Sequence, residues 1–450
     1  MNRACPLALV ITAAAMVLAV LGIPGVAEAD AQLRKGPYLM DVGQTHAALL
    51  FELTEAATAT VTITSQGEIV QTLPSEEGDF HEVVATELEP GTAYDYQVDA
   101  GAASAAGSFT TAPVAGEGPV RFLVAGDNRT NAQAHAAVID AMRRRGGEFV
   151  VNTGDMVANG AVDEDWQELF DVERELLRDT PIFPALGNHE LYLYGVGLPG
   201  FLKYTRVPTA LGGRETYYGF DWGPVRFFML DSNDDWANTE SDQRRWLAEG
   251  LAETDRTETV AHVIIVLHHG PVSSNRHGGH PDMMSTGLLQ LFRRHEVALV
   301  LSGHDHAYER GDAHGVKYIV TGGGGAPLYD RNDPLPFQHR FEASHHFLAV
   351  EADQERVEVT AVRVDDSVIE RCAFNRGERW TCIRPASASG AFVPSEPVAS
   401  TRADDGTEPQ SDRGPGMLPV VLGAGVLLAG LAFLARIVAR RHKRASGSDD

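Results

Sequence analysis

The chain has 450 residues, which is too long for one ordinary hydrophobic core, so we expect two folded domains and additional segments. Its 62 acidic and 37 basic residues give a formal net charge of −25 at pH 7. Because there is no basic excess that could release counterions from a phosphate backbone, the charge argues against nucleic acid as a general partner.

The first 29 residues predict an export signal. Asn2 and Arg3 precede the apolar run "ALVITAAAMVLAVLGI", and the small-residue pattern Ala27-Glu28-Ala29 follows at the distance expected of a cleavage site. A transmembrane anchor that is retained in the mature protein is the alternative interpretation. The cleavage pattern favours a signal peptide at 1–29.

Residues 30–113 predict a small all-β domain. Short alternating segments such as "AALLFEL", "ATVTITS" and "AYDYQVDA" are separated by Gly, Pro and Thr, which is typical of a β-sandwich. In "LEPGTAYDYQV" a turn precedes Tyr94 and Tyr96, as in the tyrosine corner of immunoglobulin-like and fibronectin type III-like sandwiches. The segment holds no residue cluster suited to catalysis, so we interpret it as a spacer or positioning domain.

Residues 118–384 predict an α/β domain. Continuous apolar runs, among them "RFLVAG", "EFVVNTG", "HVIIVLH" and "VALVLSG", indicate strands that are covered on both faces. Between them, "DEDWQELFDVERELLRD" has apolar residues near helical spacing, and "SDQRRWLAEGLAE" begins with Ser241, a residue type favoured at helix N-caps.

Two cysteines lie near the end of this domain. Cys5 would leave with the signal, so the mature chain keeps Cys372 and Cys382 in "RCAFNRGERWTCIR". Their spacing predicts a hairpin closed by a disulfide bond, which suits an exported protein. A zinc pair is the alternative, and it is weaker because the C-x-x-C spacing and a nearby histidine are missing.

The C-terminal segments predict a membrane anchor. Residues 385–416 are rich in Pro, Ser, Gly and Asp, which indicates a disordered tether. Residues 417–435 carry no charge and are long enough to span a bilayer, and the tail at 436–450 is basic. By the positive-inside rule the tail is cytoplasmic, so we expect an exported, membrane-anchored protein with its folded domains outside the cytoplasm. A sorting signal that is later removed is the alternative.

Five predicted strands of the α/β domain end in side chains that can bind metal. These are Asp127 in "GDNR", Asp155 in "GDMV", Asn188 and His189 in "GNHE", His268 and His269 in "LHHGP", and His304 and His306 in "GHDH". Gly-Asp after a single strand usually indicates a capped turn. Five such ends, however, can converge beyond the carboxyl edge of an α/β sheet. Carboxylate, amide oxygen and imidazole suit first-row metal ions, and a shared aspartate suits two ions side by side.

With these motifs in this order, the chain resembles the calcineurin-like metallophosphoesterases. The segment "GHDHAYER" and the all-β domain directly before the catalytic domain are similar to the purple acid phosphatase branch. The resemblance implies an α/β fold in which a metallophosphoesterase β-sandwich is flanked by helices and preceded by an all-β, fibronectin type III-like sandwich. It also implies a metal-dependent phosphoric ester hydrolase.

The resemblance further implies a metal-binding role for each matching residue. Asp155 would bridge two metal ions, and Asp127 and His306 would hold the first ion. The implied ligands of the second ion are Asn188, His268 and His304. His269 is the alternative ligand. We prefer His268 because members of the family usually bind metal through the histidine that ends the strand. Iron, manganese and zinc all remain possible.

Three residues are implied to be catalytic: Asp155, His189 and His277. His189 is expected to contact the phosphate or to protonate the leaving group, a role that suits imidazole. His277 is a candidate for a second phosphate contact, and an ordinary loop histidine is the alternative. Two cations ~3.5–4 Å apart would lower the pKa of a bridging water, so that hydroxide attacks the phosphorus in line.

We therefore expect a dinuclear, acid phosphatase-like enzyme that hydrolyses monoesters of a small phosphorylated substrate. A phosphodiesterase that uses the same ligands is the alternative. A surface binding module with a decayed first metal site is less favoured, because such a module has no evident need for His189.

The first metal site departs from the family pattern. Purple acid phosphatases have a tyrosine ligand where "GDMVA" has Ala158, and other branches have a histidine where "GDNR" has Arg129. The first ion could take extra water, Arg129 could bind phosphate, or the ion could be bound weakly. Because Ala158 replaces the tyrosine, we expect no purple charge-transfer band.

Overall fold

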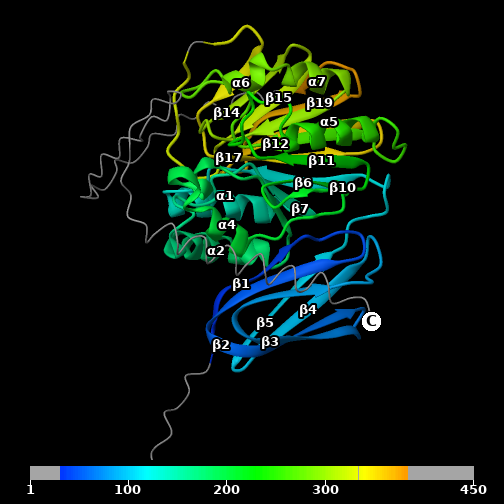
Figure 1. Ribbon diagram of the computed structural model, residues 1–450, viewed down its shortest axis with the longest axis vertical. Coiled ribbons are helices and arrows are strands. Elements are labelled where there is room, and N and C mark those ends of the chain that lie inside the picture. Colours follow the sequence, from blue (N-terminus) through cyan, green and yellow to red (C-terminus); the bar gives the residue numbers. More distant parts are fainter. Residues whose placement is uncertain (1–30, 333, 384–450) are drawn as a thin grey trace, which may run out of the picture.

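The computed structural model describes residues 31–332 and 334–383. Four predicted segments lie outside the described residues: the signal at 1–29, the tether at 385–416, the span at 417–435 and the tail at 436–450. Within the described ranges, no helix is both long and apolar enough to cross a membrane. Figure 1 shows an all-β domain at one end of the molecule and a larger α/β domain at the other.

The N-terminal domain is all-β, as predicted. Its strands are β1 (Leu33–Met40), β2 (Ala47–Ser65), β3 (Glu68–Ala85), β4 (Ala93–Ala100) and β5 (Ala103–Thr110). Two segments that the sequence predicts as separate strands are joined in the long β2, which pairs with β1, β3 and β4 in one hydrogen-bonded sheet. The register of β2 against β3 shifts between Glu52 and Ala57, where the two segments meet. The fibronectin type III-like arrangement stays a prediction.

The predicted tyrosine corner is present in this domain. The backbone N–H of Glu89 donates to the hydroxyl of Tyr94 at 2.9 Å, which is the upstream backbone contact that defines the motif. Tyr96 has a different role, because its hydroxyl donates to the carbonyl of Arg178 in the other domain at 2.7 Å. One tyrosine therefore braces the turn, and the other contacts the α/β domain.

The α/β domain contains two sheets among the described residues. One has the strand order β20-β19-β18-β17-β6-β7-β8, and the other has the order β16-β14-β15-β13-β12-β11-β10-β9. The strands are β6 (Val120–Ala125), β7 (Phe149–Asn152), β8 (Ile182–Pro184), β9 (Gly213–Arg214), β10 (Tyr217–Trp222), β11 (Val225–Leu230), β12 (His262–Leu267), β13 (Leu299–Ser302), β14 (Tyr308–Ala313), β15 (Val316–Thr321), β16 (Gln338–Glu342), β17 (His346–Ala352), β18 (Arg356–Arg363), β19 (Val368–Asn375) and β20 (Thr381–Ile383).

Aromatic side chains pack the two sheets face to face. Phe122 of β6 meets Phe227 of β11 with ring centroids 5.2 Å apart, and Phe183 of β8 stacks on Phe220 of β10 at 4.0 Å. All four side chains are buried in one apolar cluster that draws on both sheets. This packing confirms the β-sandwich that the family resemblance implies.

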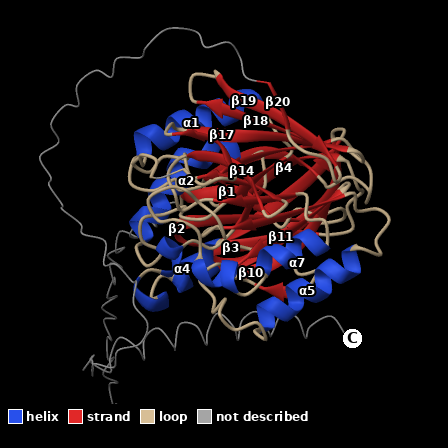
Figure 2. Ribbon diagram, turned by 90° about the horizontal axis from the view of Figure 1, so that it is seen from above, coloured by secondary structure: helices blue, strands red, loops and turns tan. Residues whose placement is uncertain are grey.

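Helices cover the outer faces of the sandwich. They are α1 (Ala132–Arg145), α2 (Asp163–Leu177), α3 (Asn188–Leu191), the 3-10 turn η1 (Leu193–Gly195), α4 (Leu198–Tyr204), α5 (Asp242–Thr254), α6 (Pro281–Ser285) and α7 (Leu288–Arg294). Figure 2 shows α1 and α2 on one side of the strands and α5 and α7 on the other. Ser241 caps α5 as predicted, since its hydroxyl accepts from the N–H of Arg244 at 3.2 Å.

The two domains share a buried interface. The ring of Tyr38 in β1 stacks on Phe170 in α2 with centroids 4.4 Å apart, and both side chains are buried. Beside them, the fully buried ammonium of Lys35 contacts Glu52 of its own domain and Asp163 at the start of α2. A buried charge is stable only when it is paired, so this contact fixes how the domains meet.

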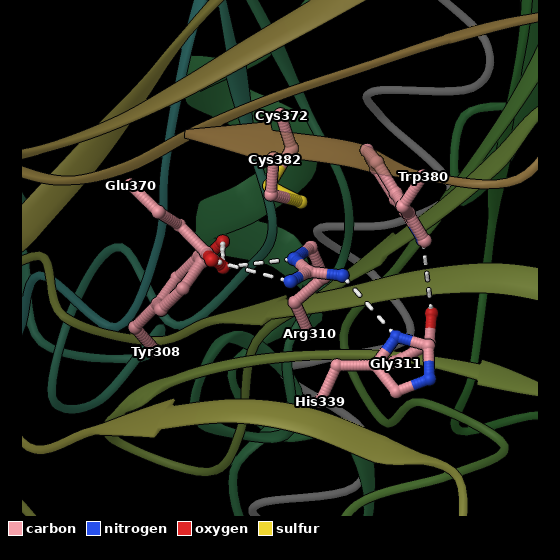
Figure 3. The surroundings of a disulfide bond; sticks show 8 residues. All are labelled: Tyr308, Arg310, Gly311, His339, Glu370, Cys372, Trp380 and Cys382. Carbon is pink, nitrogen blue, oxygen red and sulfur yellow. Dashed lines mark hydrogen bonds and ion pairs between the residues drawn. A yellow bond between two sulfur atoms is a disulfide. The ribbon is translucent and has the colours of Figure 1, made fainter. Parts of the chain in front are cut away.

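The "AYER" part of "GHDHAYER" anchors a strand. Figure 3 shows Arg310 of β14 bound to Glu370 of β19, with an Nε to Oε1 distance of 2.8 Å. The hydroxyl of Tyr308 donates to the same carboxylate at 2.9 Å. The disulfide between Cys372 and Cys382 joins β19 to β20, so the predicted hairpin is formed. The contacts of Tyr308 and Arg310 with Glu370 hold β14, which begins two residues after His306.

Candidate metal centre

Parallel strands bring the predicted ligands together. β6, β7 and β8 are parallel neighbours in one sheet, and β11, β12, β13 and β15 are parallel neighbours in the other. Their carboxyl ends therefore open toward the same edge of the sandwich. Every ligand that the sequence predicts follows one of these strand ends.

The two Gly-Asp turns place their carboxylates in the interior. Asp127 follows β6 and Asp155 follows β7, and both are completely buried with φ of 59° and 56°. The turns are bound to each other, because the N–H of Asp127 donates to the carbonyl of Gly154 at 2.9 Å. Non-glycine residues with positive φ are uncommon and cluster at functional sites, where surrounding contacts hold them.

The "GNHE" turn packs against Asp155. The N–H of His189 donates to Oδ1 of Asp155 at 3.0 Å, and the ring Nδ1 of His189 lies 2.6 Å from the carbonyl of Ala158. Gly187 has no room for a side chain, since a Cβ there would collide with the backbone nitrogen and carboxylate of Asp155. Ala158, which stands where purple acid phosphatases have a tyrosine, thus orients the ring of His189 through its backbone carbonyl.

His268 lies at the centre of the cluster. It is fully buried, and its Nε2 is 3.3 Å from Oδ1 of Asp155 and 3.0 Å from Oδ1 of Asn188. Its Nδ1 contacts the carbonyl of Thr153 at 2.9 Å, which leaves Nε2 for the site. His269 is also close, with its ring centroid 4.2 Å from that of His304, and its Nδ1 contacts Ser232 at 2.9 Å.

The "GHDH" turn closes the site opposite the "GDNR" turn. The N–H of His304 donates to Oδ2 of Asp127 at 3.0 Å, and Nε2 of His306 lies 3.4 Å from Oδ1 of Asp127. Asp305, between the two histidines, points the other way. Its carboxylate accepts from the hydroxyl of Ser273 and, at 3.0 Å, from the N–H of His277.

His277 reaches the edge of the cluster. Its ring centroid lies 4.3 Å from that of His304, so the loop that Asp305 holds brings an exposed imidazole beside a predicted metal ligand. The sequence alone leaves His277 open between a phosphate contact and an ordinary loop residue. The structure places its ring beside His304, and its contact with phosphate stays a prediction.

Opposite charges stabilise the cluster. Burial opposes ionisation of Asp155, but His268, His189 and Arg129 lower the pKa of its carboxyl well below the ordinary value. Burial likewise opposes protonation of His268, but Asp155 raises its pKa to about 9. Burial and neighbouring histidines instead lower the pKa of His304 well below its usual range. A metal ion would replace the proton of His268 and meet a neutral His304.

The donor set fits metal ions. Ligand atoms of Asp127, Asp155 and His268 lie within 4.8 Å of one another, as do those of His268, His269 and His304. Nε2 of His306 is buried and makes no hydrogen bond to any described residue, although it faces Asp127. A buried imidazole nitrogen without a donor or acceptor is costly, and a metal ion would satisfy it.

Glu190 is a site residue to which the sequence assigns no role, although it lies within the "GNHE" motif. It is fully buried, and its carboxylate accepts from the N–H groups of Gly187 at 2.8 Å, Asp155 at 3.0 Å and Val157 at 3.1 Å. Burial and the nearby charge of Asp155 raise its pKa to about 7. Glu190 therefore fastens the two turns that carry Asp155 and Asn188.

We expect Glu190→Gln to loosen the metal centre. The amide turns an N–H₂ donor toward backbone N–H donors, so one or two hydrogen bonds are lost. Metal affinity should fall ~10–100-fold, as for other groups that orient ligands, and stability by about 1–3 kcal/mol. Metal titration and thermal unfolding would measure both. The exposed Glu253→Gln in α5 is the control, and unchanged metal affinity in Glu190→Gln would contradict the role.

This fold and cluster define the domain class. Residues 120–308, which lie within the α/β domain, match the family model described as calcineurin-like phosphoesterase. Residues 30–108 match a family described as a domain of unknown function, DUF7800. The all-β and α/β parts of the structure therefore each correspond to a sequence family.

Named relatives of this domain include purple acid phosphatases. The chain is 29% identical over 264 residues to purple acid phosphatase 21 of Arabidopsis thaliana, covering 55% of this chain and 59% of that protein. It is 30% identical over 291 residues to an uncharacterized protein of Mycobacterium tuberculosis, covering 57% and 53%. The chain thus spans between about half and three fifths of these relatives.

Solved structures support the same fold. Purple acid phosphatase PPD1 from yellow lupin (Lupinus luteus) has a TM-score of 0.64 at 17% identity, covering 81% of this chain and 78% of that chain. PhoD has a TM-score of 0.62 at 12% identity, covering 80% and 92%. The metallophosphoesterase fold that the resemblance implies is therefore confirmed, and its Asp/His cluster suits the two metal ions that enzymes of this type use.

Proposed function

We propose that the protein is a phosphatase that hydrolyses phosphate monoesters at a centre of two metal ions. The observation that carries the proposal is the convergence of buried carboxylate and imidazole groups, above all Asp127, Asp155 and His268, whose ligand atoms lie within 4.8 Å. Such a cluster without a metal would be an expensive accumulation of buried polar groups. Bound metal ions would satisfy these buried groups and offset the cost of burying them.

The proposed ligands keep the roles that the family resemblance implies. Asp155 would be shared by the two ions, and Asp127 and His306 would hold the first. Asn188, His268 and His304 would hold the second ion. When bound, two such cations neutralise phosphate charge and make hydroxide available near neutral pH.

His189 is proposed to protonate the leaving alcohol. A carbonyl oxygen can only accept, so the 2.6 Å contact with Ala158 requires a hydrogen on Nδ1. The Nε2 atom is then the nitrogen that gains and gives the proton, and it lies 3.9 Å from Oδ2 of Asp155. His277 is proposed to contact the phosphate from the edge of the site.

Assays on the full-length protein test this function. Preparations loaded with iron, manganese or zinc should hydrolyse p-nitrophenyl phosphate, and a chelator should abolish the activity until metal is returned. Faster hydrolysis of bis(p-nitrophenyl) phosphate would favour the phosphodiesterase alternative. Two metal ions per chain without hydrolysis of either ester would favour a binding module.

We further propose that the folded domains lie outside the cytoplasm and are tethered to the membrane. The predicted signal and basic tail motivate this topology, and the disulfide between Cys372 and Cys382 supports it, because disulfides persist in oxidising compartments. Protease added to intact cells without an outer barrier should release a phosphatase fragment by cutting within 385–416. Recovery of the uncut chain with free thiols at both cysteines would contradict the proposal.

A further inference from the structure

A fixed positive charge lies beside the proposed bridging carboxylate. Nε of Arg129 donates to Oδ2 of Asp155 at 3.1 Å, and the arginine side chain is only 11% exposed. A guanidinium stays protonated in proteins, so Arg129 is a cation held against a buried carboxylate.

Tyr329 lies in the loop after β15, and aromatic and charged neighbours fix its ring. The ring stacks on His306 with centroids 4.1 Å apart and an angle of 18° between the planes. The ring of His277 is 5.5 Å away, and the guanidinium of Arg276 lies 4.9 Å from the ring centroid. The N–H of Tyr329 also donates to the carbonyl of His306 at 3.0 Å.

Arginine and tyrosine together offer what a phosphate monoester needs beyond two metal ions. At neutral pH a monoester is a dianion with three terminal oxygens, whereas a diester is a monoanion with two. A guanidinium presents planar N–H donors that match phosphate oxygens, and a phenol adds one O–H donor. The third terminal oxygen of a monoester can accept hydrogen bonds from these groups. In a diester the corresponding oxygen is esterified to a second alcohol and carries no charge.

We propose that Arg129 and Tyr329 bind this additional terminal oxygen and give the enzyme its preference for phosphate monoesters over diesters, an inference that rests on the phosphatase function proposed above. Arg129 follows Asp127 by two residues and contacts Asp155, and the ring of Tyr329 stacks on His306. In this position Tyr329 binds substrate and is not a metal ligand.

Two variants separate the contributions. Arg129→Lys keeps a positive charge but loses the planar fork, and Tyr329→Phe keeps the ring packing but loses the hydroxyl. We expect kcat/KM for p-nitrophenyl phosphate to fall ~100-fold in Arg129→Lys, the lower end of the range for a lost donor to an oxyanion. In Tyr329→Phe it should fall ~10-fold, as for the loss of one ordinary hydrogen bond. For bis(p-nitrophenyl) phosphate the loss should stay below ~3-fold, so the ratio of the two constants changes.

Binding measured without turnover provides the second readout. Calorimetry on the metal-loaded full chain should show weaker binding of inorganic phosphate to both variants and unchanged binding of dimethyl phosphate. Metal content should equal that of the wild type, and iron-loaded Tyr329→Phe should keep the wild-type visible spectrum. The matched controls are Arg331→Lys in the same loop and Tyr194→Phe, whose side chain is fully exposed.

The outcomes distinguish the two proposals. Equal losses for both esters, an unchanged phosphate affinity, or a charge-transfer band that disappears in Tyr329→Phe would overturn the role of the pair. A wild-type protein that hydrolyses neither ester would overturn the phosphatase function instead. In that case the affinities for phosphate and dimethyl phosphate still test the role of Arg129 and Tyr329. A variant that loses affinity for phosphate alone, relative to the wild type, shows that the two residues bind the third terminal oxygen.

Discussion

Asp155→Asn is expected to abolish phosphatase activity, with kcat falling at least ~1000-fold. The carboxylate is completely buried and is the proposed bridge, so an amide of the same shape removes one negative charge from both ions at once. Metal content should fall as well, since a neutral amide oxygen is a weak ligand for both ions. Kinetics on p-nitrophenyl phosphate and elemental analysis of the purified variant measure the two effects.

The fold should survive this substitution. Asparagine fits the same volume. In the wild type the N–H of His189 donates to Oδ1 of Asp155 at 3.0 Å, and the side-chain oxygen of asparagine can accept the same hydrogen bond. The exposed Asp171→Asn in α2 is the control for a lost aspartate charge, and circular dichroism verifies folding. A folded Asp155→Asn protein that keeps both metal ions and normal turnover would rule out the bridging role.

His189→Asn is expected to give the second largest loss, and its size should depend on the leaving group. A positioned general acid contributes ~100- to 10,000-fold. Alkyl phosphates, whose alcohols need a proton to leave, should lose ~1000-fold in kcat. The ester of p-nitrophenol, whose anion leaves readily, should lose less than ~10-fold. A plot of rate against leaving-group acidity for wild type and variant measures the difference.

The metal content of His189→Asn distinguishes a general-acid role of His189 from a role in holding the metal site together. Because the ring of His189 contacts the carbonyl of Ala158, His189→Asn should leave metal content unchanged. The exposed His314→Asn serves as the control for loss of an imidazole. Equal losses with alkyl and aryl esters would show that His189 binds phosphate and does not protonate the leaving group.

The sequence was most informative where the periodicity was strong and the ligands followed strand ends. Continuous apolar runs indicate strands that are covered on both faces, which predicts an α/β domain. The ends of its strands can converge at one edge of the sheet, which predicts that the motifs of Asp127 and His304 lie together. The structure places the N–H of His304 3.0 Å from Oδ2 of Asp127. The separate strands expected within 47–65 form one strand, because local turn signals cannot reveal whether pairing continues through them.

Contacts that depend on a rotamer or on segments far apart in the sequence could not be predicted in the same way. Tyr329 follows a glycine-rich turn and carries no spacing that links it to His306, so only the folded chain reveals their 4.1 Å stacking. Arg129 is visible in "GDNR", but its contact with Asp155 depends on a rotamer that the surrounding burial selects. Glu190 likewise acts through three backbone groups that lie in two separate turns.

The sequence by itself therefore determined the ordered set of candidate ligands at strand ends and the two domain types, because hydrophobic period and residue chemistry are local properties of the chain. The tertiary structure decided which groups surround that set. Arg129, Glu190 and Tyr329 come from segments far apart in the sequence, and their contacts arise only when two sheets and their connecting loops pack against one another. Packing of this kind depends on shape and burial across the whole domain, which no short stretch of residues encodes.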